Sequence, residues 1–239
     1  MSKLIDPKNL PKHIAITMDG NGRWAKSKGK IRVFGHKNGI KAVRETVEIA
    51  AEIGIKFLTL YAFSTENWKR PKTEVNALMT LLISAIKKET ATLMKNSIKL
   101  ETIGNTNDLP IKAKKELFSA IEKTKNNNRM TLILALSYSG KWDILNAIKN
   151  IIANKIKSEM INEDLFQQYL TTKNVPDPEL LIRTSGEYRI SNFLLWQVAY
   201  SELYFTDKLW PDFRKDDFKK AVLDYQSRER RFGKTKEQF

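Results

Sequence analysis

The sequence predicts an α/β fold: a single domain in which a central, mostly parallel sheet is covered by helices on both faces. Strand-like apolar runs alternate with helix-like segments along the chain, which is the pattern of consecutive βα units. The 239 residues contain no internal repeat, low-complexity linker or convincing domain boundary. Several polar loops follow the predicted strands, and parallel sheets bind ligands at the carboxyl ends of their strands.

The elements of the first half are predicted from apolar periodicity. Residues 14–18 and 56–63 are apolar runs typical of buried strands. A helix is expected from about Gly35 to Ile53, with Gly54 as its C-terminal stop. A longer helix is expected from Thr73 to Asn96, and Thr73 is its candidate N-cap.

The second half continues the alternation. Strands are expected at residues 98–103, 130–138 and 179–183, with a weaker one at 202–205. Helices are expected at residues 110–125, 142–157 and 213–231, and the last of these is highly charged. The helix over 142–157 carries apolar residues at helical spacing, namely Leu145, Ile148, Ile152 and Ile156. We expect residues 1–11 and 234–239 to be a flexible leader and tail.

Composition limits the classes of function. Hydrophobic residues make up 41% of the chain and aromatic residues 10%, as in a globular protein. The absence of cysteine excludes disulfides and thiolate metal sites and fits a reducing cytosol. No apolar signal core and no run of 18 apolar residues is present, so no membrane span is predicted.

The net charge of +15 predicts attraction to polyanions, which include nucleic acid, an anionic membrane face and phosphorylated substrates. Many lysines lie between the apolar positions of predicted helices, where solvated helix faces account for most of the excess charge. The arginines differ, because several of them lie in loops beside glycine, serine and acidic residues.

The loop Asp19–Trp24 combines a carboxylate, two glycines, a guanidinium and an indole directly after the first predicted strand. The glycines permit positive φ angles and bring backbone N–H groups close to a ligand. The stretch after the loop is helix-like, so its N–H groups and dipole favour an anion there. A carboxylate beside an anion site is expected where a divalent metal joins the two. The loop therefore predicts a metal-assisted phosphate or pyrophosphate site.

Two more loops follow predicted strands. Residues 64–70 offer a hydroxyl, a carboxylate, an amide and a guanidinium, and a binding loop or a hydrophilic turn anchored by Trp68 explains them equally well. Residues 183–191 bring two arginines and several hydroxyls around Gly186. Arginine suits bidentate phosphate contact, while a structural ion pair through Glu187 explains the same residues. Because these loops and residues 137–140 follow strands, we expect them to meet at one edge of the sheet.

Arg32 and His36 flank Gly35 at the start of a predicted helix, where a histidine serves either as a local hydrogen-bonding residue or as part of a site. Motifs for other chemistries are missing. The chain has no Walker-type glycine loop and no G-x-S-x-G elbow, and two histidines without cysteine do not make a conventional zinc site. Asp216-Asp217 lacks the third aspartate of the motif found in all-helical prenyltransferases.

Several segments together resemble the cis-prenyltransferase family, in particular the bacterial members that make undecaprenyl pyrophosphate. They are residues 13–25 (HIAITMDGNGRWA), 35–37 (GHK), 61–68 (YAFSTENW), 182–187 (IRTSGE), 189–197 (RISNFLLWQ), 202–205 (ELYF) and 210–211 (WP). The resemblance implies a Mg²⁺-dependent α/β homodimer that adds isopentenyl pyrophosphate to farnesyl pyrophosphate with cis double bonds. The product would be undecaprenyl pyrophosphate, a lipid carrier precursor for cell-wall glycans.

The resemblance also implies residue roles. Asp19 would be the central catalytic carboxylate, binding Mg²⁺ and assisting pyrophosphate departure, and Glu202 would complete the magnesium site. Asn67 has the usual assignment as proton acceptor, although an amide is a weak base and pyrophosphate itself could take the proton. Arg231-Phe232-Gly233 resembles an element that reaches the partner subunit. Substrate contacts are implied for Gly20, Asn21, Gly22, Arg23, Trp24, Arg32, His36, Ser64, Thr65, Glu66, Trp68, Arg70, Arg183, Arg189, Ile190 and Ser191.

The growing hydrocarbon would need an apolar tunnel, whose walls the helix 73–96 and the strand 130–136 can supply. Where the family usually has Asn-Tyr-Gly-Gly-Arg, this chain has Ser137-Tyr138-Ser139-Gly140-Lys141, which puts the local geometry of that loop in question. One alternative is a non-catalytic subunit of the same fold, but such subunits lose loop residues that are present here. The other alternative is a basic nucleic-acid-binding protein, which rests on charge alone. We expect no nucleic-acid partner and a cytoplasmic enzyme, with peripheral contact at the inner membrane face left open.

Overall fold

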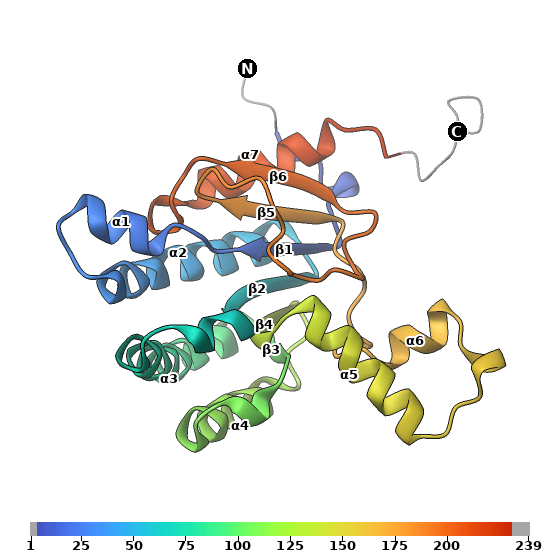
Figure 1. Ribbon diagram of the computed structural model, residues 1–239. Helices are drawn as coiled ribbons and strands as arrows, with labels where there is room; N and C mark the ends of the chain where they lie inside the picture. Colours follow the sequence, from blue (N-terminus) through green and yellow to red (C-terminus); the bar gives the residue numbers. More distant parts are fainter. Residues whose placement is uncertain (1–3, 231–239) are drawn as a thin grey trace.

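Six parallel strands form one sheet in the order β3-β4-β2-β1-β5-β6 (Figure 1). The structure is a computed structural model that describes residues 4–230. The strands are β1 (His13–Thr17), β2 (Phe57–Ser64), β3 (Ile98–Ile103), β4 (Met130–Tyr138), β5 (Leu180–Thr184) and β6 (Glu202–Thr206). All of the predicted strands are therefore confirmed to within about one residue, the weak one at residues 202–205 included.

The registers of β1 place the ends of three strands together. Ile16 pairs with Leu60 of β2 and Thr17 with Arg183 of β5. Because the strands are parallel and in this register, the loops that follow β1, β2 and β5 leave the sheet at the same edge. β4 joins β2 and ends at Tyr138, opposite Ser64. The expected meeting of the four polar loops at one edge is confirmed.

The helices are α1 (Asn21–Ser27), α2 (Arg32–Ile53), α3 (Lys72–Lys95), α4 (Ile111–Thr124), α5 (Gly140–Ala153), α6 (Glu163–Tyr169) and α7 (Lys215–Gln226). α2 ends at Gly54 as predicted, with a left-handed φ of 103°. The predicted N-cap Thr73 is wrong, because Pro71 occupies that position and α3 begins at Lys72. α5 stops at Ala153 rather than at residue 157, and α6 was not predicted.

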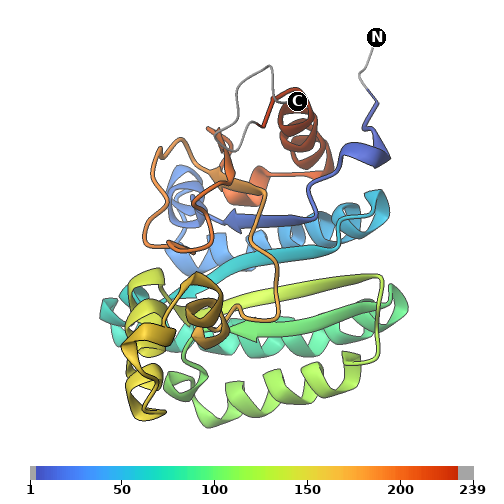
Figure 2. The same ribbon diagram turned by 90° about the vertical axis from the view of Figure 1, so that its right-hand side faces the viewer.

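Helices cover both faces of the sheet, as the sequence predicts (Figures 1 and 2). The larger core packs α2, α3, α4 and α7 on one face, around buried side chains such as Leu58, Leu60 and Leu132. The smaller core lies on the other face, where Phe193 and Leu194 of the segment after β5 cover Ala15 and Ile133. The sheet edge where the polar loops meet is thus built on strands that are buried on both sides.

The apolar face of α5 does not pack on this core. Leu145 and Ile152 are 57% and 70% exposed, and Ile148 is also exposed. The side of α5 that faces inward instead carries Asp143, Ala147 and Ile151. The periodicity therefore predicted an apolar face correctly, but this face is exposed at the surface of the molecule.

The chain termini show two further features. Residues 6–9 of the expected flexible leader are hydrogen-bonded to α7, because Gln226 donates to the carbonyls of Asp6 and Asn9 at 2.7 and 2.9 Å. The Arg231-Phe232-Gly233 element lies outside the described residues. Between residues 4 and 230, no helix combines the length and the apolarity needed to cross a membrane.

Buried His13 on β1 makes the stability of the fold depend on pH. Its Nδ1–H donates to the carbonyl of Pro176 at 2.6 Å, and its Nε2 accepts from the Thr59 hydroxyl at 2.7 Å. Burial lowers the pKa of His13 from 6.5 to about 4. Between these pH values the unfolded chain binds more protons at His13 than the folded chain does. The contribution of His13 to the free energy of unfolding is therefore complete above pH 6.5 and is lost as the pH falls through 4.

We therefore expect the free energy of unfolding to fall as the pH is lowered from 6.5 to 4, with His13 contributing about 3 kcal/mol of the change. Urea unfolding followed by tryptophan fluorescence at a series of pH values measures this. A His13→Gln variant should be less stable at pH 7.5 but should lose less stability on acidification. An equal pH slope in the variant would contradict the assignment.

Candidate functional site

Asp19 lies just beyond the end of β1, and its backbone is fixed by the neighbouring strand. Its N–H donates to the Thr184 hydroxyl at 2.9 Å, and that hydroxyl donates to the Asp19 carbonyl at 2.7 Å. The next residue, Gly20, has a φ of 102°, and a Cβ there would lie 2.9 Å from a Leu209 side-chain carbon. Glycine is required by both the conformation and the space. The loop thus turns sharply into α1 and leaves the Asp19 carboxylate at the sheet edge.

The Asp19 carboxylate is held in its ionised form. One oxygen accepts from the Gly20 N–H at 2.6 Å, and the other accepts from the Arg183 guanidinium at 2.9 Å. Partial burial by itself raises the pKa of Asp19, but the hydrogen bonds from Arg183 and Gly20 and the charges of Arg183 and Arg23 outweigh it and leave the pKa below its usual value. Asp19 is therefore a negative charge at neutral pH.

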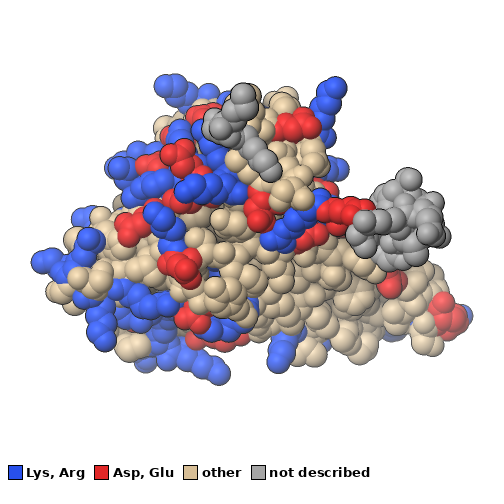
Figure 3. Space-filling model, turned by 90° about the horizontal axis from the view of Figure 1, so that it is seen from above, with Lys and Arg blue, Asp and Glu red and all other residues tan. Residues whose placement is uncertain are grey.

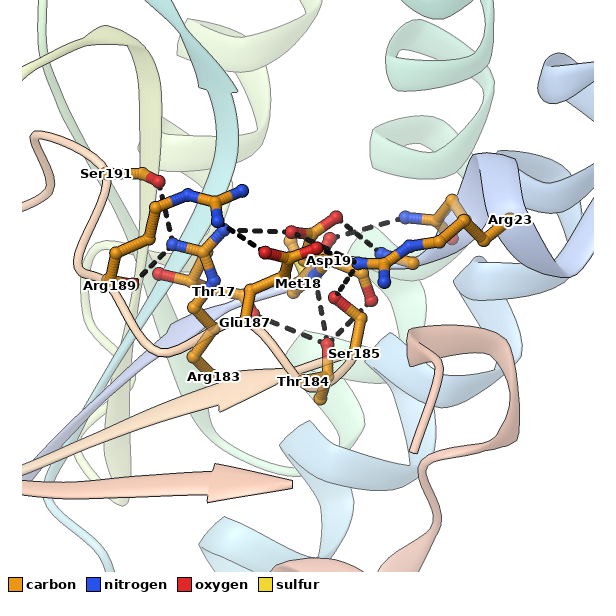
Figure 4. Close-up of polar contacts among 12 residues, drawn as sticks. Thr17, Met18, Asp19, Arg23, Arg183, Thr184, Ser185, Glu187, Arg189 and Ser191 are labelled. Carbon is orange, nitrogen blue, oxygen red and sulfur yellow. Dashed lines mark hydrogen bonds and ion pairs between the residues drawn. The ribbon is translucent and has the colours of Figure 1, made fainter. Parts of the chain in front are cut away.

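Arg183 is the buried cation of the site, with only 3% of its side chain exposed. In addition to Asp19, its guanidinium donates to the Ser191 hydroxyl at 2.7 Å and to the backbone carbonyl of Arg189 (Figure 4). The Arg183 guanidinium therefore connects the end of β1 to the loop that follows β5. Four non-glycine residues of that loop have positive φ angles, namely Ser185, Ser191, Asn192 and Leu194, so its shape depends on such tertiary contacts.

A chain of ion pairs runs along the outer side of Asp19. Arg23 lies 3.1 Å from Glu187 and 3.9 Å from Asp19, and it donates to the Ser185 hydroxyl at 2.5 Å. Glu187 also pairs with Arg189 (Figure 4). The ion pair through Glu187, which the sequence offered as the structural alternative, is therefore present. Both arginines are largely exposed, so they can turn towards an anion.

α1 and α2 approach each other closely enough to bury Asn21. A Cβ on Gly35 of α2 would lie 1.9 Å from the Asn21 carbonyl oxygen, so only glycine fits there. His36 follows on the same turn, and its Nε2 is buried without a hydrogen-bond partner. Burial, and then the charges of Arg70 and Arg32, lower the pKa of His36 to about 4, against an opposing effect of Glu74. His36 is therefore neutral at pH 7 and lies between two cations.

The loop after β2 is a 3₁₀ helix, Thr65–Lys69, capped by its own side chains. Asn67 caps it, because its Oδ1 accepts from the Ser64 N–H at 3.2 Å. Glu66 accepts from Asn192 at 2.8 Å, across the site. Burial alone raises the pKa of the Glu66 carboxyl. The hydrogen bond from Asn192, together with other hydrogen bonds to this carboxyl, outweighs burial and leaves the pKa below its usual value, so Glu66 is ionised.

Arg70 and Arg32 both reach Glu74 at the start of α3. The distances from the two guanidinium nitrogens to the same carboxylate oxygen are 3.1 and 3.3 Å. These ion pairs tie together the loop after β2, the start of α2 and the start of α3. Arg32 and His36 of α2 therefore converge with Arg70 of the loop that follows β2.

Two pockets meet at Asp19. The first has a volume of about 220 Å³, and its polar end includes Asp19, Gly20, Asn21, Gly22, Arg32, His36, Asn67 and Arg70. The second has a volume of about 480 Å³ and includes Asp19, Ser64, Glu66, Asn67, Arg183 and Ser191. Asp19, Asn67 and Arg70 line both pockets, so a group bound in one pocket lies beside a group bound in the other.

The first pocket continues into an apolar space between α2 and α3. Its inner walls are Ile40 and Val43 of α2, Leu78 and Leu82 of α3 and Leu136 of β4. A separate apolar cavity of about 80 Å³ lies deeper along the same helices and shares Val43 with the first pocket. The predicted walls, helix 73–96 and strand 130–136, are thus the walls of these two spaces.

Some predicted residues lie outside the two pockets. Trp24 stacks on Phe34 and donates to Asp212 at 2.9 Å. Trp68 packs against Phe63 and donates to the Ser137 hydroxyl at 2.9 Å. Thr65 lies in the 3₁₀ helix, and half-buried Ile190 packs on the smaller core.

Glu202 is not brought to Asp19 within the chain. It is the first residue of β6, opposite Leu180 at the start of β5, whereas the site lies where these strands end. Its carboxylate pairs with Arg228 at 2.8 Å. In the described subunit, the predicted completion of a magnesium site by Glu202 is therefore not present.

The structure adds two residues that the sequence did not single out. Thr184 fixes the Asp19 backbone, and Asn192 holds Glu66. Thr184 and Asn192 lie within or next to the loop that was singled out, so closeness to Arg183 and Ser191 was the available signal. The unusual Ser137 and Ser139 are also well placed, because Ser137 donates to Asp108 at 2.7 Å and Ser139 caps α5.

The donor set suits Mg²⁺ only in combination with a bound anion. Among residues 4–230, no three His, Cys, Asp or Glu side chains lie close enough together to hold a metal. Asp19 offers a partly exposed, ionised carboxylate between two pockets that are rich in arginine. Mg²⁺ is commonly held by one or two carboxylates together with phosphate oxygens of a substrate, and this arrangement fits that pattern.

Comparison with known proteins gives consistent matches. A family model described as "Putative undecaprenyl diphosphate synthase" matches residues 17–233. Ditrans,polycis-undecaprenyl-diphosphate synthase ((2E,6E)-farnesyl-diphosphate specific) of Pasteurella multocida is 53% identical, over 98% of this chain and 99% of its own length. An isoprenyl transferase of Chlorobaculum tepidum is 55% identical, over 96% of this chain and 88% of its own length.

The fold is also found among solved structures. The crystal structure of lavandulyl diphosphate synthase from Lavandula x intermedia, in complex with dimethylallyl diphosphate, has a TM-score of 0.92 and 36% sequence identity. The match covers 95% of this chain and 100% of that one. The similarity therefore spans nearly the whole chain.

Proposed function

This chain belongs to the undecaprenyl diphosphate synthase family of cis-prenyltransferases, and from that premise we propose how its two pockets divide the work. It is a prenyltransferase that condenses isopentenyl diphosphate onto farnesyl diphosphate. The assignment of one substrate to each pocket rests on the position of Asp19 and Asn67, because both residues line both of the arginine-rich pockets. One pocket also has an apolar extension and the other has none.

The farnesyl substrate occupies the first pocket. Its diphosphate lies at the polar end, where Arg32, Arg70 and the backbone of Gly20–Arg23 offer N–H donors. Its hydrocarbon lies between α2 and α3, against Val43 and Leu82. Isopentenyl diphosphate occupies the second pocket, where Arg183 and Ser191 face its phosphates and Arg189 can turn inward. The two substrates then meet at Asp19.

The reaction forms one carbon–carbon bond and breaks one carbon–oxygen bond. The terminal alkene carbon of isopentenyl diphosphate bonds to C1 of the allylic substrate, and the diphosphate leaves with the electron pair of the C1–O bond. Negative charge grows on the departing group, and the fixed donors of the first pocket stabilise it. The apolar walls keep water from the developing allylic cation. Loss of a proton from the new chain then gives the double bond.

The departing diphosphate is the better proton acceptor. Asn67 was the assignment implied by the family, but its Oδ1 already accepts from the Ser64 N–H, and an amide is a weak base. The free donor end of the Asn67 amide suits a phosphate oxygen in either pocket. Asn67 therefore orients both substrates rather than taking the proton.

Mg²⁺ is the cofactor that this donor set fits, with Asp19 as its protein ligand and diphosphate oxygens as the others. When bound, the ion supplies positive charge to the leaving diphosphate. Arg183 fixes the Asp19 carboxylate in place through one of its two donor arms. Glu202 of the same subunit is too far along β6 to share in this role.

The subunit forms a homodimer through the open apolar face of α5. Leu145, Ile148 and Ile152 are exposed together on this helix, and such a face is typical of a subunit interface. The enzyme works in the cytoplasm and makes contact with the inner membrane face, where its lipid product is used. Undecaprenyl diphosphate, the precursor of a lipid carrier for cell-wall glycans, is the expected product.

The function is tested by incubating the purified protein with farnesyl diphosphate, radiolabelled isopentenyl diphosphate and Mg²⁺. We expect polyprenyl products of about eleven isoprene units, separated by reversed-phase chromatography, with the added double bonds all cis by NMR. A protein that extends no chain, or adds trans units, would show that the proposal is wrong.

Product length should respond to side-chain volume on α3. Leu82 lines the apolar part of the first pocket and Ile86, one turn on, lines the deeper cavity. We expect Leu82→Trp to shift the products to shorter chains, because the indole fills the space between α2 and α3, while the first condensation continues. Phe118→Trp on α4, away from both spaces, is the matched control and should leave the length distribution unchanged.

A further inference from the structure

The loop between α1 and α2 carries an unusual charge pattern. Residues 20–44 contain eight Lys and Arg and no Asp or Glu. Arg23, Arg32, Lys41 and Arg44 form ion pairs with acidic residues from elsewhere in the chain or from later on α2. Within the described residues, Lys26, Lys28 and Lys30 are exposed and have no acidic partner. Figure 3 shows Lys and Arg gathered at the end of the molecule where Figure 1 places α1.

An exposed apolar side chain directly follows these lysines in the chain. Ile31 is 77% exposed, and Phe34 on the next turn is also exposed. The loop is held in shape by backbone bonds from Lys28 and Lys30 to the Ala25 carbonyl, at 3.1 and 2.9 Å. A fixed loop that presents an isoleucine among unpaired lysines matches the chemistry of an anionic bilayer surface, which has phosphates above and hydrocarbon below.

The same loop forms one wall of an open groove that adjoins the active site. The groove has a volume of about 740 Å³. It is lined by Lys30 and Ile31 of this loop, by Lys26 of α1 and Val33 of α2, and by Thr73, Glu74 and Ala77 of α3. It shares Gly22 and Arg32 with the first pocket. A surface that touches lipid here would therefore place the membrane next to the pocket where the hydrocarbon enters and grows.

We propose that residues Lys26–Ile31 dock the enzyme on an anionic membrane, with Ile31 in the interfacial layer and the three lysines on lipid phosphates. The proposal rests on the proposed function only for its purpose, namely transfer of a lipid product to the bilayer. Nucleic acid fits the loop less well. The rings of Trp24 and Phe34 are stacked on each other, and Lys28 lies over the Trp24 ring, so neither ring stands apart as a platform for base stacking.

The first experiment measures co-sedimentation of the full chain with vesicles of phosphatidylglycerol and phosphatidylcholine, and with vesicles of phosphatidylcholine alone. The loop variant is Lys26→Gln/Lys28→Gln/Lys30→Gln. Its matched control is Lys112→Gln/Lys115→Gln/Lys123→Gln, which removes the same charge from exposed positions on α4. We expect the loop variant to bind anionic vesicles about 100-fold more weakly than the wild type and the control to bind nearly as well as the wild type. Equal losses in the two variants would mean that net charge alone drives binding and would overturn the proposal.

The second experiment tests insertion. The chain has no cysteine, so Ile31→Cys gives a single thiol that can be labelled with an environment-sensitive fluorophore. We expect a blue shift of its emission with anionic vesicles and none from the matched probe Ile111→Cys, since Ile111 is also highly exposed, at 87%. No shift at residue 31 would overturn the proposal, as would a loop variant that loses affinity for RNA but keeps its affinity for vesicles.

Chain extension measured in detergent separates this proposal from the proposed function. The loop variant should extend farnesyl diphosphate at the wild-type rate, because its lysines do not line either substrate pocket. A wild-type protein that binds vesicles but extends no chain would refute the enzyme assignment alone. A loop variant that is active and still binds vesicles normally would refute the docking surface alone.

Discussion

Replacement of Asp19 by asparagine should reduce the rate of prenyl transfer about a thousandfold and leave the fold intact. The amide has the shape of the carboxylate and can still accept a hydrogen bond from Arg183, so the free energy of unfolding should fall by only about 1 kcal/mol. The negative charge is lost, and with it the proposed protein ligand for Mg²⁺ and the ion pair with Arg183.

Steady-state kinetics with farnesyl and isopentenyl diphosphates measure this effect, and urea unfolding checks the fold. Asp216→Asn is the matched control, because Asp216 is exposed at the start of α7, away from both pockets, and its variant should keep the wild-type rate. If Asp19→Asn retained more than about a tenth of the wild-type rate, Asp19 would not be the central group of the site.

Arg183→Met should also lower kcat/KM for isopentenyl diphosphate by two to three orders of magnitude, roughly the loss of two charge-assisted hydrogen bonds. It should additionally change the pH profile. In the wild type, Arg183 opposes the effect of burial and keeps the pKa of Asp19 low. Without that cation the pKa of Asp19 rises, so Asp19 becomes protonated, and activity is lost, at a higher pH on the acidic side.

The pH dependence of kcat/KM distinguishes this role from a purely structural one. Arg183→Lys keeps the charge but not the fork that reaches Asp19, Ser191 and the Arg189 carbonyl together. It should shift the acidic limb less than Arg183→Met does. Arg129→Met, an exposed arginine before β4, should not shift it at all. An unchanged acidic limb in Arg183→Met would separate Arg183 from the ionisation of Asp19.

The sequence predicts the sheet well because its central strands are largely buried. Strand β4 reads Met-Thr-Leu-Ile-Leu-Ala-Leu-Ser-Tyr, and both of its boundaries were predicted correctly. In a parallel sheet covered on both sides, burial leaves long apolar runs that differ plainly from the loops. The order of elements then placed the polar loops at one edge without any knowledge of side-chain positions.

Helix ends were harder to predict. α6 spans only seven residues, and none of them is buried, so it has no apolar period to detect. The sequence feature that could have indicated this helix is its N-cap residue, Asn162, whose side chain accepts from the Leu165 N–H at 2.9 Å. α5 stops early because Asn154 is its C-cap and Lys155 has a φ of 54°, the left-handed conformation that is common at the residue after a C-cap.

Three features depend on the tertiary structure and could not be predicted from patterns in the chain. The periodicity of α5 identified an apolar face, but nothing in the spacing says whether a sheet or solvent lies against it. Glu202 was assigned from a motif, yet it begins its strand whereas the other site residues follow theirs. The contact between the buried Arg183 guanidinium and Asp19 likewise depends on the pairing of β1 with β5, which the sequence pattern does not specify.

The hydrogen bond between Asp19 and Arg183 joins residues 164 positions apart, and this separation has a consequence for synthesis on the ribosome. Domains begin to fold from the N-terminus as the chain emerges, so β1 to β4 can assemble while β5 is still being made. Until β5 pairs with β1, the nascent protein has an open strand edge in the middle of its future sheet and only half of its site. Such an edge invites aggregation, so the late arrival of β5 defines the interval in which the nascent chain most needs a chaperone.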